Sequence, residues 1–212
     1  MKKIAFIVAL LAVCVTMGRA QESRQDISLS GFGLIEPFMA SSTTVDVSAS
    51  PGYGALASYR YQLTPTTALE ANYGITYQNS MHFTSPNFSP SGPGYTIPIR
   101  TQEMSGALVK SFVYKNWNPF VEGGPAALIF LPIVRAGLTT LGPSQQTEIS
   151  GVGGAGFAYE ISPSFDIRVE YRGFIAKVPD FGFGSSSPNT LSLATNRWYW
   201  ISEPTVGVAY HF

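Results

Sequence analysis

Apolar and polar side chains alternate along several stretches of this chain, with the period of two that characterises a β-strand. Residues 67–78 place apolar side chains on one face and polar ones, among them Glu70 and Asn72, on the other. Residues 53–63 and 165–176 repeat the same alternation. The pattern predicts strands that each keep one face against an apolar medium.

The segments between these strands alternate between long and short. Four of them are long and rich in Ser, Thr, Gly or Pro, namely residues 39–52, 79–98, 132–146 and 177–196. Three are short, namely residues 64–66, 114–118 and 162–164. Four long and three short connections separate eight strands, and this asymmetry is typical of outer-membrane barrels.

The last stretch of the sequence, Val206–Phe212, is a strand with one apolar face. We expect it to be the eighth strand, closing against the first near Ile27 and Leu29, with its other face lining the interior. An apolar face of this kind needs a covering medium, and a bilayer supplies one.

Residues 1–20 have the pattern of a secretory signal peptide. A basic start is followed by an uncharged apolar run from Ile4 to Val15, and Gly18 and Ala20 provide the small residues before a cleavage site after Ala20. We therefore expect a mature barrel domain over residues 21–212. The single cysteine, Cys14, lies in the signal, so the mature part has no disulfide framework.

Composition supports a membrane protein built of strands. Charged residues make up only 12% of the chain and aromatic ones 13%, and no stretch after residue 20 is apolar enough for a membrane-spanning helix. We expect aromatic girdles at both membrane interfaces. The short-turn girdle would comprise Tyr61, Phe120, Phe165, Tyr210 and Phe212; the other would comprise Tyr53, Tyr77, Trp198 and Trp200. Without residues 1–20, 10 basic residues face 13 acidic ones, and the net charge of −3 argues against nucleic-acid binding.

Four short motifs carry a resemblance to a known family: Ser58–Tyr61, Pro119–Gly124, Glu170–Gly173 and Gly207–Phe212. With them the chain resembles the small OmpA/OmpX-type outer-membrane barrels that consist of the barrel alone. The resemblance implies a Gram-negative outer membrane and contact with the barrel-assembly machinery. In that family the terminal strand is the assembly signal, here Val206, Val208, Tyr210 and Phe212. With the short turns on the inner side, both termini would be periplasmic.

The expected fold is therefore all-β, an eight-stranded antiparallel up-and-down transmembrane β-barrel. We expect it to be a monomer with outer-membrane lipid as its partner. Such a barrel is only just wide enough for its own side chains. Charged residues on the polar faces would form a structural network inside it: Arg60, Glu70, Glu103, Arg168, Glu170, Arg172 and Glu203. Arg60 and Glu70 are equidistant from Pro65, so we expect them to face each other across a hairpin. The alternative is a narrow, gated, porin-like path for small solutes.

The sequence offers little for catalysis, and we expect no catalytic residue, no cofactor and no metal. Gly151–Gly156 spells a dinucleotide fingerprint, but the chain continues as strand where the motif requires a helix. His82 and His211 are the only histidines. His211 is expected to be structural, and His82 near Ser80 leaves a lipid A or phospholipid-modifying enzyme as a remote alternative.

The long segments carry aromatic side chains among small polar ones, namely Phe83, Phe88, Tyr95, Phe181 and Phe183. These rings would either bind a surface ligand through the outside loops or pack on one another; the sequence leaves both open. The interpretation favoured by the sequence is an outer-membrane barrel with a structural or surface-interaction role.

Overall fold

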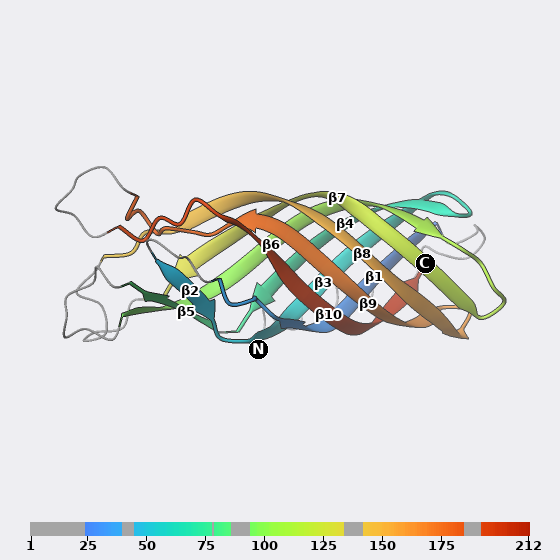
Figure 1. Ribbon diagram of the computed structural model, residues 1–212. Helices are drawn as coiled ribbons and strands as arrows, with labels where there is room; N and C mark the ends of the chain where they lie inside the picture. The colour runs from blue at the N-terminus through green and yellow to red at the C-terminus, as the bar shows by residue number, and fades with distance from the viewer. Residues whose placement is uncertain (1–23, 40–44, 78, 86–93, 134–141, 185–191) are drawn as a thin grey trace, which may run out of the picture.

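The computed structural model describes residues 24–39, 45–77, 79–85, 94–133, 142–184 and 192–212. These residues form ten strands that wrap into one elongated barrel (Figure 1). The strands are β1 (Gln25–Leu34), β2 (Asp46–Ala49), β3 (Gly52–Thr64), β4 (Thr67–Thr76), β5 (Asn79–Thr84), β6 (Tyr95–Ser111), β7 (Trp117–Pro132), β8 (Gln146–Ser162), β9 (Phe165–Lys177) and β10 (Trp198–His211).

Antiparallel pairing runs around the whole circumference, and β10 closes on β1. In that closing pair Ile27 stands opposite Tyr210 and Leu29 opposite Val208, as the sequence predicts. β2 and β5 pair with each other and extend the barrel wall beyond β3 and β4. They add length to the wall and no further strand around the circumference, so the barrel is eight-stranded. The predicted all-β, eight-stranded antiparallel barrel is confirmed.

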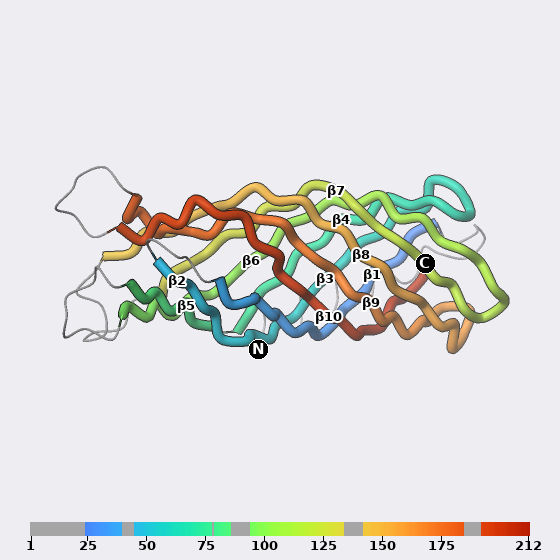
Figure 2. Tube along the Cα trace, in the orientation of Figure 1, coloured from blue at the N-terminus to red at the C-terminus, as the bar shows by residue number. Residues whose placement is uncertain are grey.

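The walls are longer than the sequence indicated. The segments 39–52 and 79–98, expected to be loops, contain β2, β5 and the start of β6. These stretches do alternate, because Val47, Met81 and Phe83 point inward and are fully buried. Their Ser, Thr and Pro content hides that alternation. β6 and β8 have 17 residues each, against about 9–11 that cross a bilayer, so the walls are longer than a bilayer crossing needs. Figure 2 shows β2 and β5 at one end of the barrel, the end of the long segments.

Most of the expected girdle residues lie on the outside of the barrel. At the long-segment end Tyr53 and Tyr77 stack with ring centroids 5.7 Å apart, and Trp198 and Trp200 are exposed there too. At the short-turn end the ring of Tyr210 lies 5.1 Å from Phe165 and 6.1 Å from Phe212. Phe120 is the exception: it is only 2% exposed and points into the barrel, so its assignment to the girdle is wrong.

Inside, the barrel is filled by two layers of different chemistry. The half nearer the short turns holds buried charged side chains, including Arg60, Arg168 and Arg172. The half nearer the long segments holds an apolar cluster with Phe83, Phe130 and other large side chains at its centre. The interior that the sequence predicts is polar throughout, and this is wrong for the second half.

The predicted signal peptide, residues 1–20, lies outside the described residues. In the described part of the chain no helix has the length and apolar character needed to span a bilayer. The fingerprint Gly151–Gly156 lies within β8 and no helix follows it, as expected.

Candidate functional site

Arg172 is the hub of the charged layer. Its side chain is fully buried on β9 and reaches carboxylates from three other strands. Nη1 donates to Glu103 Oε1 and to Glu203 Oε1, both at 2.8 Å, and Nη2 donates to Ser105 Oγ at 3.0 Å. Nε lies 3.3 Å from Glu122 Oε1 and 3.9 Å from Glu170 Oε1. A guanidinium can serve so many acceptors because its donors are fixed in a planar fork.

A second group of charges lies nearer the short turns. Arg60 and Glu70 face each other across the β3–β4 hairpin, and Arg60 Nε donates to Glu70 Oε2 at 2.6 Å. Arg168 Nη1 lies 3.4 Å from the same oxygen, and its Nη2 donates to Asp26 Oδ1 at 3.0 Å. The seven charged residues named from the sequence thus all point inward and are joined by ion pairs.

The structure adds members that the sequence reasoning missed. Asp26 and Glu122 are buried partners of Arg168 and Arg172, and Asp166 pairs with His211. The signal for Asp166 was available, since it alternates with Ile167 on β9. Glu122 was hidden by Phe120, because assigning Phe120 to the outside turns Glu122 outward as well.

Phe120 packs against both arginines of the second group. Its ring lies 4.8 Å from the guanidinium carbon of Arg60 and 5.9 Å from that of Arg168. Cation–π attraction is worth about 2 kcal/mol or more where the charge is desolvated. This attraction is a physical reason for a phenylalanine inside a charged layer.

Two glycines of β8 make room for these side chains. A Cβ on Gly156 would overlap both Glu170 and the ring of Phe120, and one on Gly154 would lie 3.2 Å from Glu122 Oε1. Glycine within a strand marks a place where other groups approach the backbone closely, and this packing is an example.

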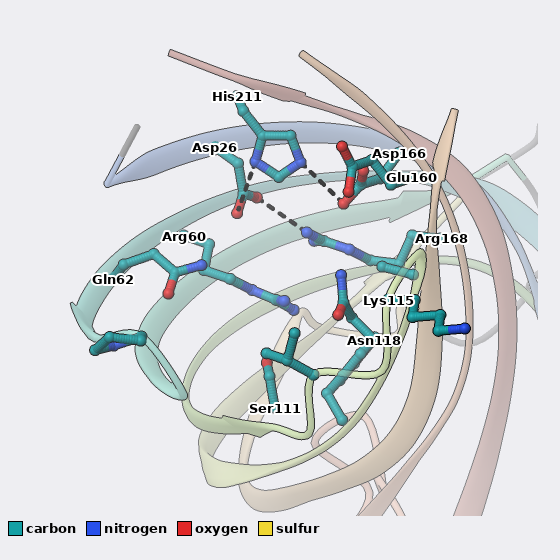
Figure 3. A pocket seen from close by; sticks show the side chains of 14 residues that line it. Asp26, Arg60, Gln62, Ser111, Lys115, Asn118, Glu160, Asp166, Arg168 and His211 are labelled. Carbon is teal, nitrogen blue, oxygen red and sulfur yellow. Dashed lines mark hydrogen bonds and ion pairs between the residues drawn. The ribbon is translucent and has the colours of Figure 1, made fainter. Parts of the chain in front are cut away.

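At the short-turn mouth the charged layer opens into a polar cavity of about 190 Å³ (Figure 3). His211 Nε2 lies 2.9 Å from Asp166 Oδ2, and its Nδ1 lies 4.0 Å from Asp26 Oδ2. Asp26 in turn holds Arg168, so His211 completes a chain of polar contacts across the mouth. The expected structural, inward-pointing placement of His211 fits this geometry.

The apolar layer closes the other half of the barrel. Phe83 of β5 and Phe181, which follows β9, are fully buried and meet edge to face with centroids 6.1 Å apart. Tyr95 and Phe183 pack against the same cluster, and Phe88 lies outside the described residues. Of the two readings of the loop aromatics, packing on one another is the one that the described rings adopt.

One carboxyl group lies within this apolar layer. Glu36, just beyond the end of β1, is 8% exposed and accepts a hydrogen bond from Asn79 Nδ2 at 3.2 Å. Burial raises the pKa of Glu36 from 4.5 to about 7, and the hydroxyl of Tyr199 opposes that rise only in part.

His82 shows no catalytic arrangement in the described contacts. It lies on β5, and its Nδ1 is 2.9 Å from Thr96 Oγ1 on the neighbouring strand. This is an ordinary cross-strand pair.

The four residues of the expected assembly signal lie on the outer face or edge of β10. Val206 and Val208 are 58% and 49% exposed, and Tyr210 and Phe212 are half-buried by their stacked rings. The backbone N–H of Phe212 donates to Gln25 O at 3.0 Å, which ties this end of the chain to β1.

A closed antiparallel barrel with an apolar, aromatic-bordered outside is the architecture of integral outer-membrane β-barrels. The chain belongs to the outer membrane protein beta-barrel domain family, whose model matches residues 6–212. Its localisation is therefore the outer membrane.

Solved structures with the same fold share little sequence with this chain. OprG from Pseudomonas aeruginosa is 12% identical with a TM-score of 0.60, and the match covers 90% of this chain and 96% of that one. Neisserial surface protein A is 14% identical with a TM-score of 0.56, covering 90% and 98%. Ail of Yersinia pestis, in complex with the heparin analogue sucrose octasulfate, is 11% identical with a TM-score of 0.50, covering 89% and 96%. A search of the curated proteins finds no match.

Proposed function

We propose that this protein is a non-conducting, non-catalytic barrel of the outer membrane with a structural or surface-interaction role. The observation that carries the proposal is the double filling of its interior. A solute would have to pass the charged layer around Arg172 and then the apolar layer around Phe130, and both side chains are fully buried. The interior of an eight-stranded barrel is only just wide enough for side chains to fill it or for one small ligand.

The long-segment end is the side that we assign to the cell exterior. Short periplasmic turns and longer outer loops are the rule in this class, and by that rule β1 starts and β10 ends in the periplasm. The strands that continue past the membrane would then raise a rigid collar above the surface. Ail carries a heparin analogue in its solved complex, and this supports a surface ligand as one use of such a collar.

The remaining parts of the proposal concern maturation. Residues 1–20 would be removed after Ala20, and the barrel-assembly machinery would bind β10. Pairing of β10 with β1 completes the hydrogen bonding of the barrel within the single chain, which supports a monomer surrounded by lipid.

Planar-bilayer recording tests the proposal. Purified, folded protein should give no stable unitary openings, because both layers lie in series along the same axis. A variant that truncates only the apolar layer, Phe83→Ala with Phe181→Ala, should also stay closed, since the Arg172 network remains. A known open porin recorded in the same lipid is the positive control.

Stable openings of the wild-type barrel would overturn the proposal in favour of the narrow channel. Release of fatty acid from lipid A or phospholipid by the purified protein would overturn its non-catalytic part.

A further inference from the structure

The charged layer contains more negative than positive side chains. Among the described residues of this layer, six buried carboxyl groups surround three buried arginines, and Asp166 and His211 form a separate pair at the mouth. The carboxyl groups are those of Asp26, Glu70, Glu103, Glu122, Glu170 and Glu203; the guanidinium groups are those of Arg60, Arg168 and Arg172. An uncompensated buried charge costs several kcal/mol, so this layer needs further positive charge.

Three of the carboxyl groups converge on one point. Glu70 of β4, Glu122 of β7 and Glu170 of β9 each place one oxygen so that the three atoms lie within 4.8 Å of one another. All three residues are at least nine-tenths buried. They come from different sides of the barrel, and the closure of the sheet brings them together.

These carboxylates also retain oxygens without hydrogen-bond donors. Glu70 Oε1, Glu170 Oε2 and both oxygens of Glu122 are buried and accept no hydrogen bond. Arg60 and Arg168 share one oxygen of Glu70, Oε2. Arg172 directs Nη1 and Nη2 to Glu103, Glu203 and Ser105, so that only its Nε lies near Glu122 Oε1, at 3.3 Å, and Glu170 Oε1, at 3.9 Å. Buried polar atoms without partners are rare, and a bound ion is one way to satisfy them.

We propose that Glu70, Glu122 and Glu170 form a binding site for a divalent cation, with Ca²⁺ as its preferred occupant. Carboxylate oxygens are the ligands of hard cations. Opposite ligands of Ca²⁺ stand about 4.6–5.2 Å apart, whereas those of Mg²⁺ stand about 4.0–4.2 Å apart. The three oxygens lie within 4.8 Å of one another, which leaves room for the ligand separations of the larger ion.

Gly154 and Gly156 on β8 leave the space beside them to the side chains of Glu122, Glu170 and Phe120. Ca²⁺ takes six to eight oxygens, so second carboxylate oxygens or water would supply the remaining ligands. The bound ion would add two of the missing positive charges and join three strands at the level of the membrane.

The test measures calcium on the folded, full-length mature barrel. Protein folded in detergent with Ca²⁺ and then desalted should retain about one calcium per chain by elemental analysis. Titration of the chelator-treated barrel with Ca²⁺ should raise its thermal unfolding midpoint, and Mg²⁺ should have a smaller effect. Glu122→Gln should weaken the response at least tenfold, while the matched change at the partly exposed mouth residue, Glu160→Gln, should leave it unchanged.

Without calcium, we expect the Glu122→Gln substitution to raise the stability of the barrel instead of lowering it. In chelator it should unfold at a higher temperature than the wild type, because it removes one excess buried charge. Glu170→Gln serves as the second variant if Glu122→Gln does not fold. A wild-type barrel without retained calcium or a midpoint shift would overturn the proposal and assign neutralisation to protons. Full calcium binding by both folded glutamine variants would overturn the placement of the site.

Discussion

Arg60 shows what one buried side chain does in this interior. It donates to Glu70 and stacks on Phe120, so Arg60→Ala removes both contacts and leaves Glu70 with Arg168 alone, at 3.4 Å. Losing one partner of a buried ion pair costs about 3–5 kcal/mol. We therefore expect a clear fall in the temperature at which the folded form converts to the unfolded one on a gel.

Arg100→Ala is the matched control, because Arg100 is an exposed arginine on β6. Equal unfolding temperatures for the two variants would show that the pairing of Arg60 does not stabilise the barrel.

Glu36 gives the apolar layer a dependence on pH. Its pKa is raised from 4.5 to about 7, so the folded state holds the proton more tightly than the unfolded state does. Its contribution to stability is complete below pH 4.5 and is lost as the pH rises through 7. The loss approaches about 3 kcal/mol at high pH. Glu36→Gln should unfold at a higher urea concentration than wild type at pH 8 and at nearly the same concentration at pH 4.5.

The same comparison for Glu160→Gln corrects for general effects of removing a carboxylate. The urea concentrations at which wild type and Glu36→Gln unfold could also differ by the same amount at pH 8 and at pH 4.5. That result would contradict the buried, protonated state of Glu36.

The sequence predicts correctly which side chains point into the barrel where a strand has one clear apolar face. Arg60 and Glu70 are found opposite each other because both are polar residues within an alternating hairpin. Phe120 was misplaced because it neighbours Val121, and two adjacent apolar residues leave the parity of a strand open. Its inward position depends on Arg60 and Arg168, which come from other strands.

At the scale of the element, β10 carries the assembly prediction. Its outer edge bears Tyr210 and Phe212 in stacked contact, and the family resemblance assigns this edge to the assembly machinery. Phe212→Ala should reduce the amount of folded protein in the membrane several-fold, while the barrel that does fold keeps nearly the unfolding temperature of the wild type, because Phe212 lies beyond the last paired residue of β10.

Heat-shifted gels of isolated outer membranes measure both quantities. Trp117→Ala is a suitable control, since it removes an exposed aromatic side chain from the same end of the barrel. Normal membrane levels of the Phe212→Ala barrel would contradict the assignment.

Element lengths were the least predictable part of the fold. β2 and β5 lie in stretches that Ser, Thr and Pro mark as loops, yet they pair with each other and bury Val47 and Phe83. A short strand of weak propensity forms when a neighbouring strand and a buried face are available. Neither condition can be seen in the local sequence.

At the scale of the whole molecule, the proposed closure of the interior depends on two filled layers in series. The charged layer fixes the half within the membrane, and the apolar layer fixes the half that continues beyond it. The absence of conductance predicted above belongs to this scale, because neither layer by itself decides it.

The sequence by itself determined the strand number, the order of neighbours, the closure of β10 on β1 and the inward direction of the main charges. These depend on alternation and on connection length, which are local properties. Only the tertiary structure decided that Glu70, Glu122 and Glu170 meet and that half of the interior is apolar. The spacing of residues along one chain could not show a metal site, since its three carboxylates come from three strands that the curvature of the closed sheet brings together.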